Sequence, residues 1–224
     1  MKKLIFKHLL LAVIAFLCSI TAKAYSFEFD GVCYAITSEN EVSVSAKGEK
    51  YSGDIVIPEI VNYDGKAFKV TSINTVAFEF CHELTSISIP KTIKAMYHHA
   101  FYGCENLTAV YINDLSSWCE IDHNAYSNPL NYAHNLYLNG ELVTNLVIPS
   151  DVTEIKNDAF ECCNSLKSVK IHDGVTAIGN YAFQLCESLT EVKIDEGVKC
   201  VADYAFYKCP TLASINIPNS VTTI

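Results

Sequence analysis

An apolar pattern returns at a fixed spacing along most of this 224-residue chain. Each copy contains an alanine-phenylalanine pair, a cysteine four residues after the alanine, and a leucine three residues after the cysteine. Successive copies are separated by 23, 59, 23 and 23 residues, and the long step equals one 23-residue period plus 36 residues. Their alanines are Ala77, Ala100, Ala159, Ala182 and Ala205. A period of this length predicts a solenoid, in which each unit buries its apolar side against its neighbours.

The leucine of each copy opens a second pattern, LxxLxL, which occurs as LTSISI, LTAVYI, LKSVKI, LTEVKI and LASINI. Its last three positions alternate apolar and polar side chains, and this alternation predicts a half-buried strand. The alanine, cysteine and leucine fall at i, i+4 and i+7, which places them on one face of a short helical turn. The pattern therefore predicts a mostly β chain with short helical turns.

The phenylalanines and cysteines at the repeat positions are the predicted core. They are Phe78, Phe101, Phe160, Phe183, Phe206, Cys81, Cys104, Cys163, Cys186 and Cys209. Cysteines of neighbouring units should lie one inter-strand spacing apart, with parallel side chains whose Cβ atoms stay too far apart for a disulfide. We therefore expect a row of reduced, buried thiols. The sequence leaves open whether any two of the other cysteines pair: Cys33, Cys119, Cys162 and Cys200.

Residues 27–224 resemble the BspA-type leucine-rich repeat family of secreted and surface proteins, found largely in host-associated anaerobic bacteria. The segments VTAIGNYAFQLCESLTEVKI, IPSDVTEI and IPNSVTTI carry the resemblance. It implies a right-handed leucine-rich-repeat solenoid with 23-residue units and an N-terminal β cap. Similar proteins are associated with adhesion to host matrix or to other bacteria, so the resemblance also implies a protein or glycoprotein ligand.

The beginning of the chain predicts export. Lys2, Lys3 and Lys7 precede an apolar run over residues 9–20, and Ala22-Lys23-Ala24 supplies the small residues of a signal-peptidase site. We expect residues 1–24 to be a signal peptide and the mature protein to be secreted or held at the cell surface. The apolar run is shorter than the roughly 20 residues that a membrane-spanning helix needs, so no membrane span is expected in the mature chain.

The remaining chain divides into four expected parts. Residues 25–69 read as paired strands that cap the solenoid, residues 70–112 as the first two repeats, and residues 146–224 as three repeats followed by a truncated sixth. Residues 113–145 are an insertion. Within it, Asn139-Gly140 stands between alternating apolar residues and predicts a β-hairpin with a type I′ turn.

Charge argues against nucleic acid as a partner. Four of the sixteen Lys and Arg residues and none of the 25 acidic ones lie in residues 1–24, so the remainder carries 12 minus 25, or −13. Affinity for phosphates depends on clustered basic side chains that release counterions. The chain contains no arginine at all, which also disfavours a dedicated anion site.

The insertion contains residue types that could support catalysis or bind a metal. Cys119 and His123 could be read as a nucleophile and a base, but no orienting third group or oxyanion hole is identifiable, so we expect no enzyme activity. We expect Trp118 to pack the insertion onto the solenoid, and His98-His99 to be solvated turn residues. Zinc-type spacing of cysteine and histidine is absent from the sequence, so neither a metal nor a cofactor is expected.

The polar positions inside the predicted strands suggest a binding face, because solenoids commonly bind partners along such an extended surface. The candidate binding residues are Ser88, Tyr111, Lys170, Lys193, Asn216 and the flanking Glu191. An ordinary solvated sheet face is the alternative for these positions. The sequence favours a secreted or surface binding and adhesion module over a structural spacer. A glycan-processing enzyme ranks third, since no carboxylate pair can be placed across a cleft. The ligand and the oligomeric state are left open.

Overall fold

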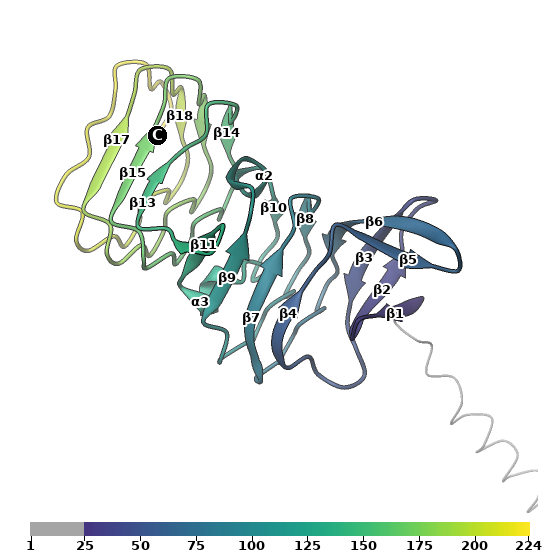
Figure 1. Cartoon of the computed structure of the whole chain (residues 1–224). Coiled ribbons are helices and arrows are strands. Elements are labelled where there is room, and N and C mark those ends of the chain that lie inside the picture. The colour runs from purple at the N-terminus through teal and green to yellow at the C-terminus, as the bar shows by residue number, and fades with distance from the viewer. Residues whose placement is uncertain (1–24) are drawn as a thin grey trace, which may run out of the picture.

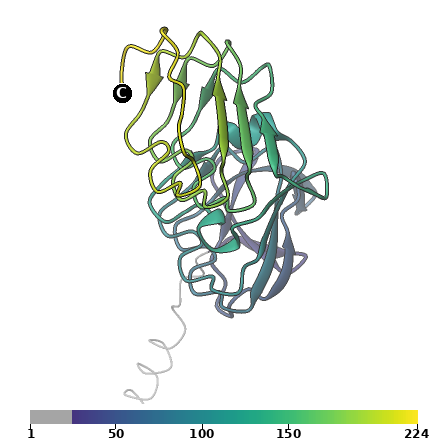
Figure 2. The same cartoon turned by 90° about the vertical axis from the view of Figure 1, so that its left-hand side faces the viewer.

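The computed structural model describes residues 25–224, and the predicted signal peptide lies outside the described residues. The chain winds into a mostly β solenoid of about six turns, with a spacing of roughly 23 residues between successive turns. Figure 1 shows the coils advancing from the N-terminal strands to the C-terminus, and Figure 2 shows them stacked one behind another. The fold class predicted from the repeat is therefore confirmed.

One side of the solenoid carries the strands that the LxxLxL pattern predicts, and we call it the strand face. Its first sheet is parallel except for the terminal hairpin strand β12. The members are β4 (Gly53–Val56), β7 (Leu84–Ile89), β9 (Ala109–Ile112), β11 (Leu136–Leu138) and β12 (Glu141–Leu142). A second, wholly parallel sheet continues the same face with β13 (Asn145–Val147), β15 (Ser168–Ile171) and β17 (Glu191–Ile194).

A second set of strands lies behind the strand face. Antiparallel strands begin it, and β3 then passes into a parallel ladder with β6. The members are β1 (Phe27–Phe29), β2 (Val32–Ile36), β3 (Glu41–Ser45), β5 (Ile60–Tyr63), β6 (Lys66–Ile73), β8 (Ala95–Met96) and β10 (Asp122–His123). A separate three-stranded sheet follows, with β14 (Glu154–Ile155), β16 (Ala177–Ile178) and β18 (Cys200–Val201).

The segments expected as helical turns in the repeats are strings of tight turns. Cys163 N donates to Phe160 O over 3.1 Å, which is a contact of the i to i+3 kind, while Phe160 N donates to Ala182 O of the next coil over 2.8 Å. Asp158 and Cys162 both adopt positive φ and so interrupt any helix. Within the described residues, helices occur only between the second and third repeats, as α2 (Leu115–Cys119) and α3 (Leu130–Ala133).

The repeated phenylalanines stack in two columns inside the coils. Ring centroids lie 4.9 Å apart for Phe78 and Phe101, 5.2 Å apart for Phe160 and Phe183, and 5.3 Å apart for Phe183 and Phe206. The rings of each pair are nearly parallel. All are buried except Phe206, which is partly exposed in the last full coil of residues 25–224.

The repeated cysteines lie beside the phenylalanine columns. All nine cysteines of residues 25–224 are free thiols. Cys81, Cys104, Cys163 and Cys186 are buried, whereas Cys209 in the last coil is partly exposed. The Cys186 thiol donates to Phe160 O of the preceding coil over 3.3 Å, and the Cys104 thiol donates in the same way to Phe78 O over 3.1 Å. These thiols therefore link each coil to its predecessor as well as filling space.

The 36 extra residues add a coil to the stack. Leu136 of β11 pairs with Val110 of β9, 26 residues earlier, and β10 pairs with β8 on the other side. A hairpin then turns the chain back at Asn139 and Gly140, whose φ values of 52° and 87° fit a type I′ turn. Ten residues after Leu136, Leu146 opens the next parallel sheet. Both strand ladders are interrupted at this boundary.

Candidate binding site on the strand face

Five outward-facing residues form one continuous row across the first sheet of the strand face. The register pairs Val56 with Ser88, Ser88 with Tyr111, Tyr111 with Tyr137, and Tyr137 with Leu142. We call Val56, Ser88, Tyr111, Tyr137 and Leu142 the outer row. The rings of Tyr111 and Tyr137 lie 4.9 Å apart between centroids. The row is therefore mainly apolar and aromatic, although it faces solvent.

The second sheet presents a different row, which we call the lysine row: Val147, Lys170 and Lys193. Both lysines are exposed. Lys193 Nζ lies 3.2 Å from a carboxylate oxygen of Asp195. Glu191 is exposed on β17 beside this row, and Asn216 is exposed in a segment without assigned strand structure.

The structure brings some of the predicted binding residues together and separates others. Ser88 and Tyr111 are neighbours, and so are Lys170 and Lys193. Tyr111 and Lys170 occupy the same position of consecutive sequence repeats, but the added coil and the hairpin lie between their strands. The predicted face is thus two rows.

Four residues of the two rows were missed in the sequence, three of them because of the register, whereas Val147 lies one 23-residue period before Lys170. They are Val56, Tyr137, Leu142 and Val147. A usable signal existed in LYL at residues 136–138 and IVIP at residues 55–58, which share the alternation of the repeat strands. Neither lies at a multiple of 23 residues from the other copies, so the period alone could not assign them.

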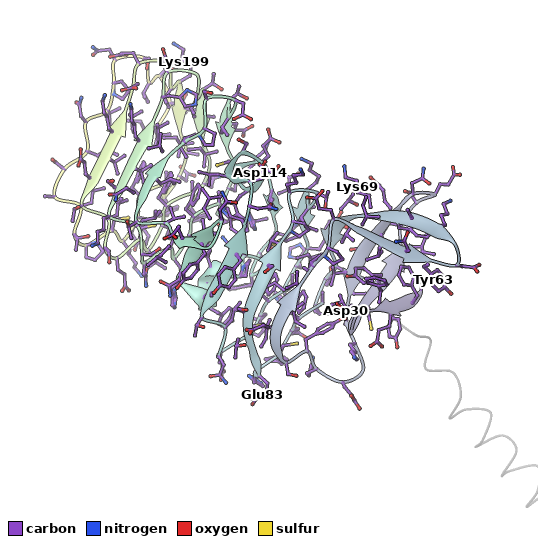
Figure 3. All side chains as sticks on the ribbon, viewed as in Figure 1. Asp30, Tyr63, Lys69, Glu83, Asp114 and Lys199 are labelled. Atoms are coloured by element: carbon purple, nitrogen blue, oxygen red, sulfur yellow. The ribbon has the colours of Figure 1, made fainter. Side chains whose placement is uncertain are left out.

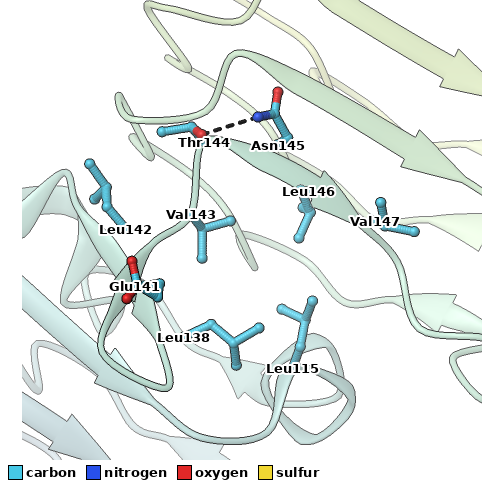
Figure 4. Close-up of a pocket in the computed structure, with 9 residues that line it drawn as sticks. All are labelled: Leu115, Leu138, Glu141, Leu142, Val143, Thr144, Asn145, Leu146 and Val147. Carbon is cyan, nitrogen blue, oxygen red and sulfur yellow. Dashed lines mark hydrogen bonds between the residues drawn. The ribbon is translucent and has the colours of Figure 1, made fainter.

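A pocket of about 350 Å³ opens where the two sheets separate. We call it the junction pocket. Figure 4 shows Glu141 and Leu142 on one side of it, residues 144–147 on the other, and Leu115 and Leu138 below. Its lining is Leu115, Leu138, Glu141, Leu142, Val143, Thr144, Asn145, Leu146 and Val147. Most of these side chains are apolar, and Glu141 is the single charged one.

A second hollow of about 350 Å³ lies along the outer row. Val56, Ser88 and Tyr111 line it together with the isoleucine-proline pairs at the ends of β4 and β7. The outer row is therefore bordered by concave surface.

The start of the added coil is fixed by a helix cap. Asp114 accepts a hydrogen bond from Ser117 N over 2.8 Å and begins α2 directly after β9. This bond, which stabilises the carboxylate, holds the pKa of Asp114 below its usual value. Asp114 is labelled in Figure 3 at the edge of the strand face. The cap thereby sets the position of Leu115 in the lining of the junction pocket.

Trp118 packs the added coil against the following repeat. The residue is 1% exposed, and its Nε1 donates to Ala159 O over 2.8 Å. Further side-chain contacts cross the same boundary, from Ser116 to Asp151 and from Asn131 to Glu161. Side chains thus join the two halves of the solenoid where strand pairing stops, together with backbone bonds from Lys156 N to Cys119 O and from Asn164 N to His134 O.

The environments of Cys119 and His123 do not suit catalysis. Burial raises the pKa of the Cys119 thiol to about 12, so the reactive thiolate is strongly disfavoured near neutral pH. Burial lowers the pKa of His123 to about 3, and both ring nitrogens are buried without a hydrogen-bond partner. The His123 ring instead packs edge-on against Trp118, with centroids 5.7 Å apart. We read both residues as part of the packing of the added coil.

Two carboxylates meet on the turn side of the same boundary. Desolvation, together with the nearby charge of Glu161, raises the pKa of Asp158 to about 7. Glu161 accepts hydrogen bonds from Asn131 over 3.1 Å and from Gln184 over 2.8 Å. Burial raises the pKa of Glu161 as well. Asp158 and Glu161 are three residues apart in the same turn, and Asn131 of the added coil and Gln184 of the next repeat donate to Glu161 from either side.

The histidine pair of the second repeat lies among other aromatic side chains. His98 is exposed, while the ring of His99 packs 5.2 Å from Tyr102 and 5.4 Å from Tyr126 between centroids. Over residues 25–224, no group of three or more His, Cys, Asp or Glu side chains is arranged to hold a metal ion.

Solved structures with a similar fold come from bacterial leucine-rich repeat proteins. A leucine rich cell surface protein from Faecalibacterium prausnitzii is 25% identical with a TM-score of 0.60, and a leucine-rich repeat protein from Bacteroides ovatus is 27% identical with a TM-score of 0.58. Each comparison covers 88% of this chain, but 49% and 54% of the solved chains. The chain thus spans about half the length of these proteins. No curated protein matches it.

The repeat itself identifies the family. The family model of the BspA type leucine rich repeat region matches residues 65–142 and 133–224, with six copies of the repeat. These ranges take in well over half of the chain and include the added coil. The chain belongs to the BspA type leucine rich repeat family.

Proposed function

We propose that this protein is a noncatalytic binding module that recognises a protein or glycoprotein through its strand face. The outer row carries this proposal. Val56 is 68% exposed, Tyr111 36% and Leu142 41%. Polar side chains at these outward-facing positions would leave less apolar surface in contact with water. Contiguous exposed apolar surface on a soluble protein commonly marks an interaction site, and tyrosine is enriched among the residues that dominate binding energy.

The proposed location is the cell exterior, as a secreted or surface-held adhesion protein. The family match and the Faecalibacterium prausnitzii structure, which is described as a cell surface protein, support this. The leader-like residues 1–24 support export. In residues 25–224, no helix is long and apolar enough to cross a membrane.

Surface electrostatics favour a protein ligand over nucleic acid. The chain after residue 24 carries a formal charge of −13, and the lysine row provides only two cations on the strand face. Such a surface repels phosphate backbones. A noncatalytic role is supported by the raised pKa of the Cys119 thiol, which suppresses the thiolate.

Binding measurements on residues 25–224 test the proposal. Immobilised protein is exposed to matrix glycoproteins, before and after enzymatic deglycosylation, at physiological salt. We expect saturable binding that falls about tenfold or more when Tyr111→Ser and Tyr137→Ser are combined, because both rings contribute contact area. Tyr204→Ser is the matched control, since this tyrosine is 55% exposed but lies on the turn side.

Two outcomes would contradict the proposal. An equal loss of binding in the Tyr204→Ser control would move the site away from the strand face. Absence of saturable binding to every ligand tested would favour the structural spacer. The deglycosylation arm distinguishes a protein ligand from a glycan.

A further inference from the structure

The junction pocket lies between two strand edges that no other strand covers in residues 25–224. β13 pairs only with β15, and β12 pairs only with β11. The neighbouring strands of the face each pair on both sides, from β7 to β11 in the first sheet. An open edge presents unpaired N–H and C=O groups, which can pair with another chain.

The direction of the free backbone groups follows from the printed register. Thr144 O accepts from Lys167 N over 2.7 Å, and Ile148 N donates to Lys170 O over 3.0 Å. Because backbone direction alternates along a strand, the groups of Asn145 and Val147 must point toward the open edge. Two residues of β13 thus offer N–H and C=O groups to the junction pocket.

The same alternation applies to the hairpin. Val143 N donates to Leu136 O over 2.9 Å, so the next residue back, Leu142, directs its backbone groups away from β11. The junction pocket is therefore bordered by free backbone groups on both of its strand walls.

The floor of the junction pocket has the character of the core. Leu146 is 2% exposed, Val143 8% and Leu115 9%, and Leu138 packs against the same cluster. A strand laid along β13 would alternate its side chains in the same way as β13 does. Every second side chain of that strand would point at this apolar floor, as Leu146 already does.

We infer that the junction pocket binds an extended peptide segment of a partner protein, which adds a strand to the open edge of β13. One apolar side chain of the segment occupies the floor formed by Leu115, Leu138 and Leu146. A lysine or arginine of the segment lies near Glu141, because this carboxylate is the single charge in the lining and the chain as a whole is acidic.

This inference rests on the proposed function and names how a protein ligand is held. Strand addition obtains its affinity from main-chain hydrogen bonds and its specificity from alternate side chains in pockets. A partner bound in this way would also reach the outer row, since Leu142 belongs to that row and lines the junction pocket.

A synthetic peptide serves as the probe. The peptide consists of residues 107–112 of this chain, LTAVYI, with two lysines added at each end. Residues 109–112 of this stretch form β9, a natural strand of the face, in which Val110 and Ile112 are buried and Tyr111 faces outward. Amide hydrogen exchange is followed by NMR on residues 25–224. We expect fast exchange at Asn145 and Val147 in the free protein, and a slowing of about tenfold or more on saturation with the peptide.

Two controls isolate the backbone contacts. The same peptide with alternate amides N-methylated keeps its side chains but loses its donors, and we expect it not to slow exchange. Val147→Pro removes one donor of the open edge without breaking a bond to β15, and should weaken peptide binding about tenfold or more. Val147→Ala keeps that donor and should bind nearly as well as the unaltered chain.

Unchanged exchange at Asn145 and Val147 with bound peptide would overturn the inference, as would full binding of the N-methylated peptide. If amide exchange at these residues instead slows as the protein concentration is raised in the absence of peptide, the edge is a contact between copies of this chain. If protein ligands bind through Tyr111 while the peptide fails, only strand addition is wrong. If the peptide binds while the tyrosine changes have no effect, only the outer-row proposal is wrong.

Discussion

In the regular coils, Phe160 stacks on Phe183 with ring centroids 5.2 Å apart, and the coils resemble one another residue by residue. In the added coil, Ser127 and Asn128 stand where the alanine-phenylalanine pair stands elsewhere, as shown by the bond from Ser127 N to Asn124 O that matches Ala100 N to Tyr97 O. Asn128 donates to Asp158 O over 2.6 Å. Apolar stacking is thus replaced by polar bonds in the coil that carries the junction pocket.

This difference shows how one solenoid accommodates both regularity and a site. Stacked apolar side chains hold the regular coils and leave their strand ladders unbroken. The added coil gives up that stacking and interrupts both ladders, and the open edge of β13 results. Trp118 and other side chains then hold the two halves together.

The largest expected effect is on the stacked phenylalanines of the regular coils. Phe183→Ala should lower the free energy of unfolding by about 3–5 kcal/mol, because a fully buried ring leaves a cavity. Phe206→Ala should cost clearly less, since this ring is already partly exposed. Urea unfolding of both variants compares them. Equal losses of unfolding free energy in the two variants would mean that stacking a ring between two coils adds little to stability.

The buried imidazole of the added coil should give the next largest effect. His123 pairs in register with Met96, so His123→Met restores an apolar residue. The folded-state pKa of His123 is lowered to about 3, so the unfolded chain binds the proton first as pH falls. Stability is retained above about pH 6.5 and should be about 3 kcal/mol lower at pH 4 through this group alone. His123→Met should remove that part of the loss in urea titrations at the two pH values. If the variant loses the same stability between the two pH values as the unaltered chain, the buried imidazole is not the source of that loss.

The polar link of Trp118 should have a smaller effect. Trp118→Phe keeps most of the buried ring but leaves Ala159 O without its donor, which should cost about 1–3 kcal/mol. Tyr132→Phe is the comparison, because it removes the hydroxyl that accepts from Gly103 N at a less buried position. Thermal unfolding ranks the two. A greater loss in the tyrosine variant would place the weak point of the solenoid before the added coil.

The smallest expected effect concerns Asp158, because solvent screens the charge of a carboxylate that is only partly buried. Its folded-state pKa is raised to about 7, so the folded chain holds the proton more tightly than the unfolded chain does. Stability contributed by this group is present below about pH 4 and is lost as pH rises to about 7. Asp158→Asn should therefore be more stable relative to the unaltered chain at pH 8 than at pH 4. A constant difference between the two pH values would contradict the raised pKa.

The sequence by itself determined the solenoid, its 23-residue unit and the residues that repeat in the core. A strict period can be read without coordinates because each coil must bury the same positions against the next. The sequence also identified the Asn139-Gly140 turn, since the positive φ of both residues is a local requirement.

Only the tertiary structure decided where the strand face is continuous and where it breaks. Tyr137 joins the outer row through pairing with Tyr111, 26 residues earlier, and this spacing hides the register from a search for 23. Leu142 then joins the row through the hairpin that pairs it with Tyr137. The helical turns expected in the repeats became tight turns because their N–H groups donate to the neighbouring coil. The core pattern repeats because every regular coil packs against a coil with the same apolar positions. The candidate site exists because the added coil breaks that pattern.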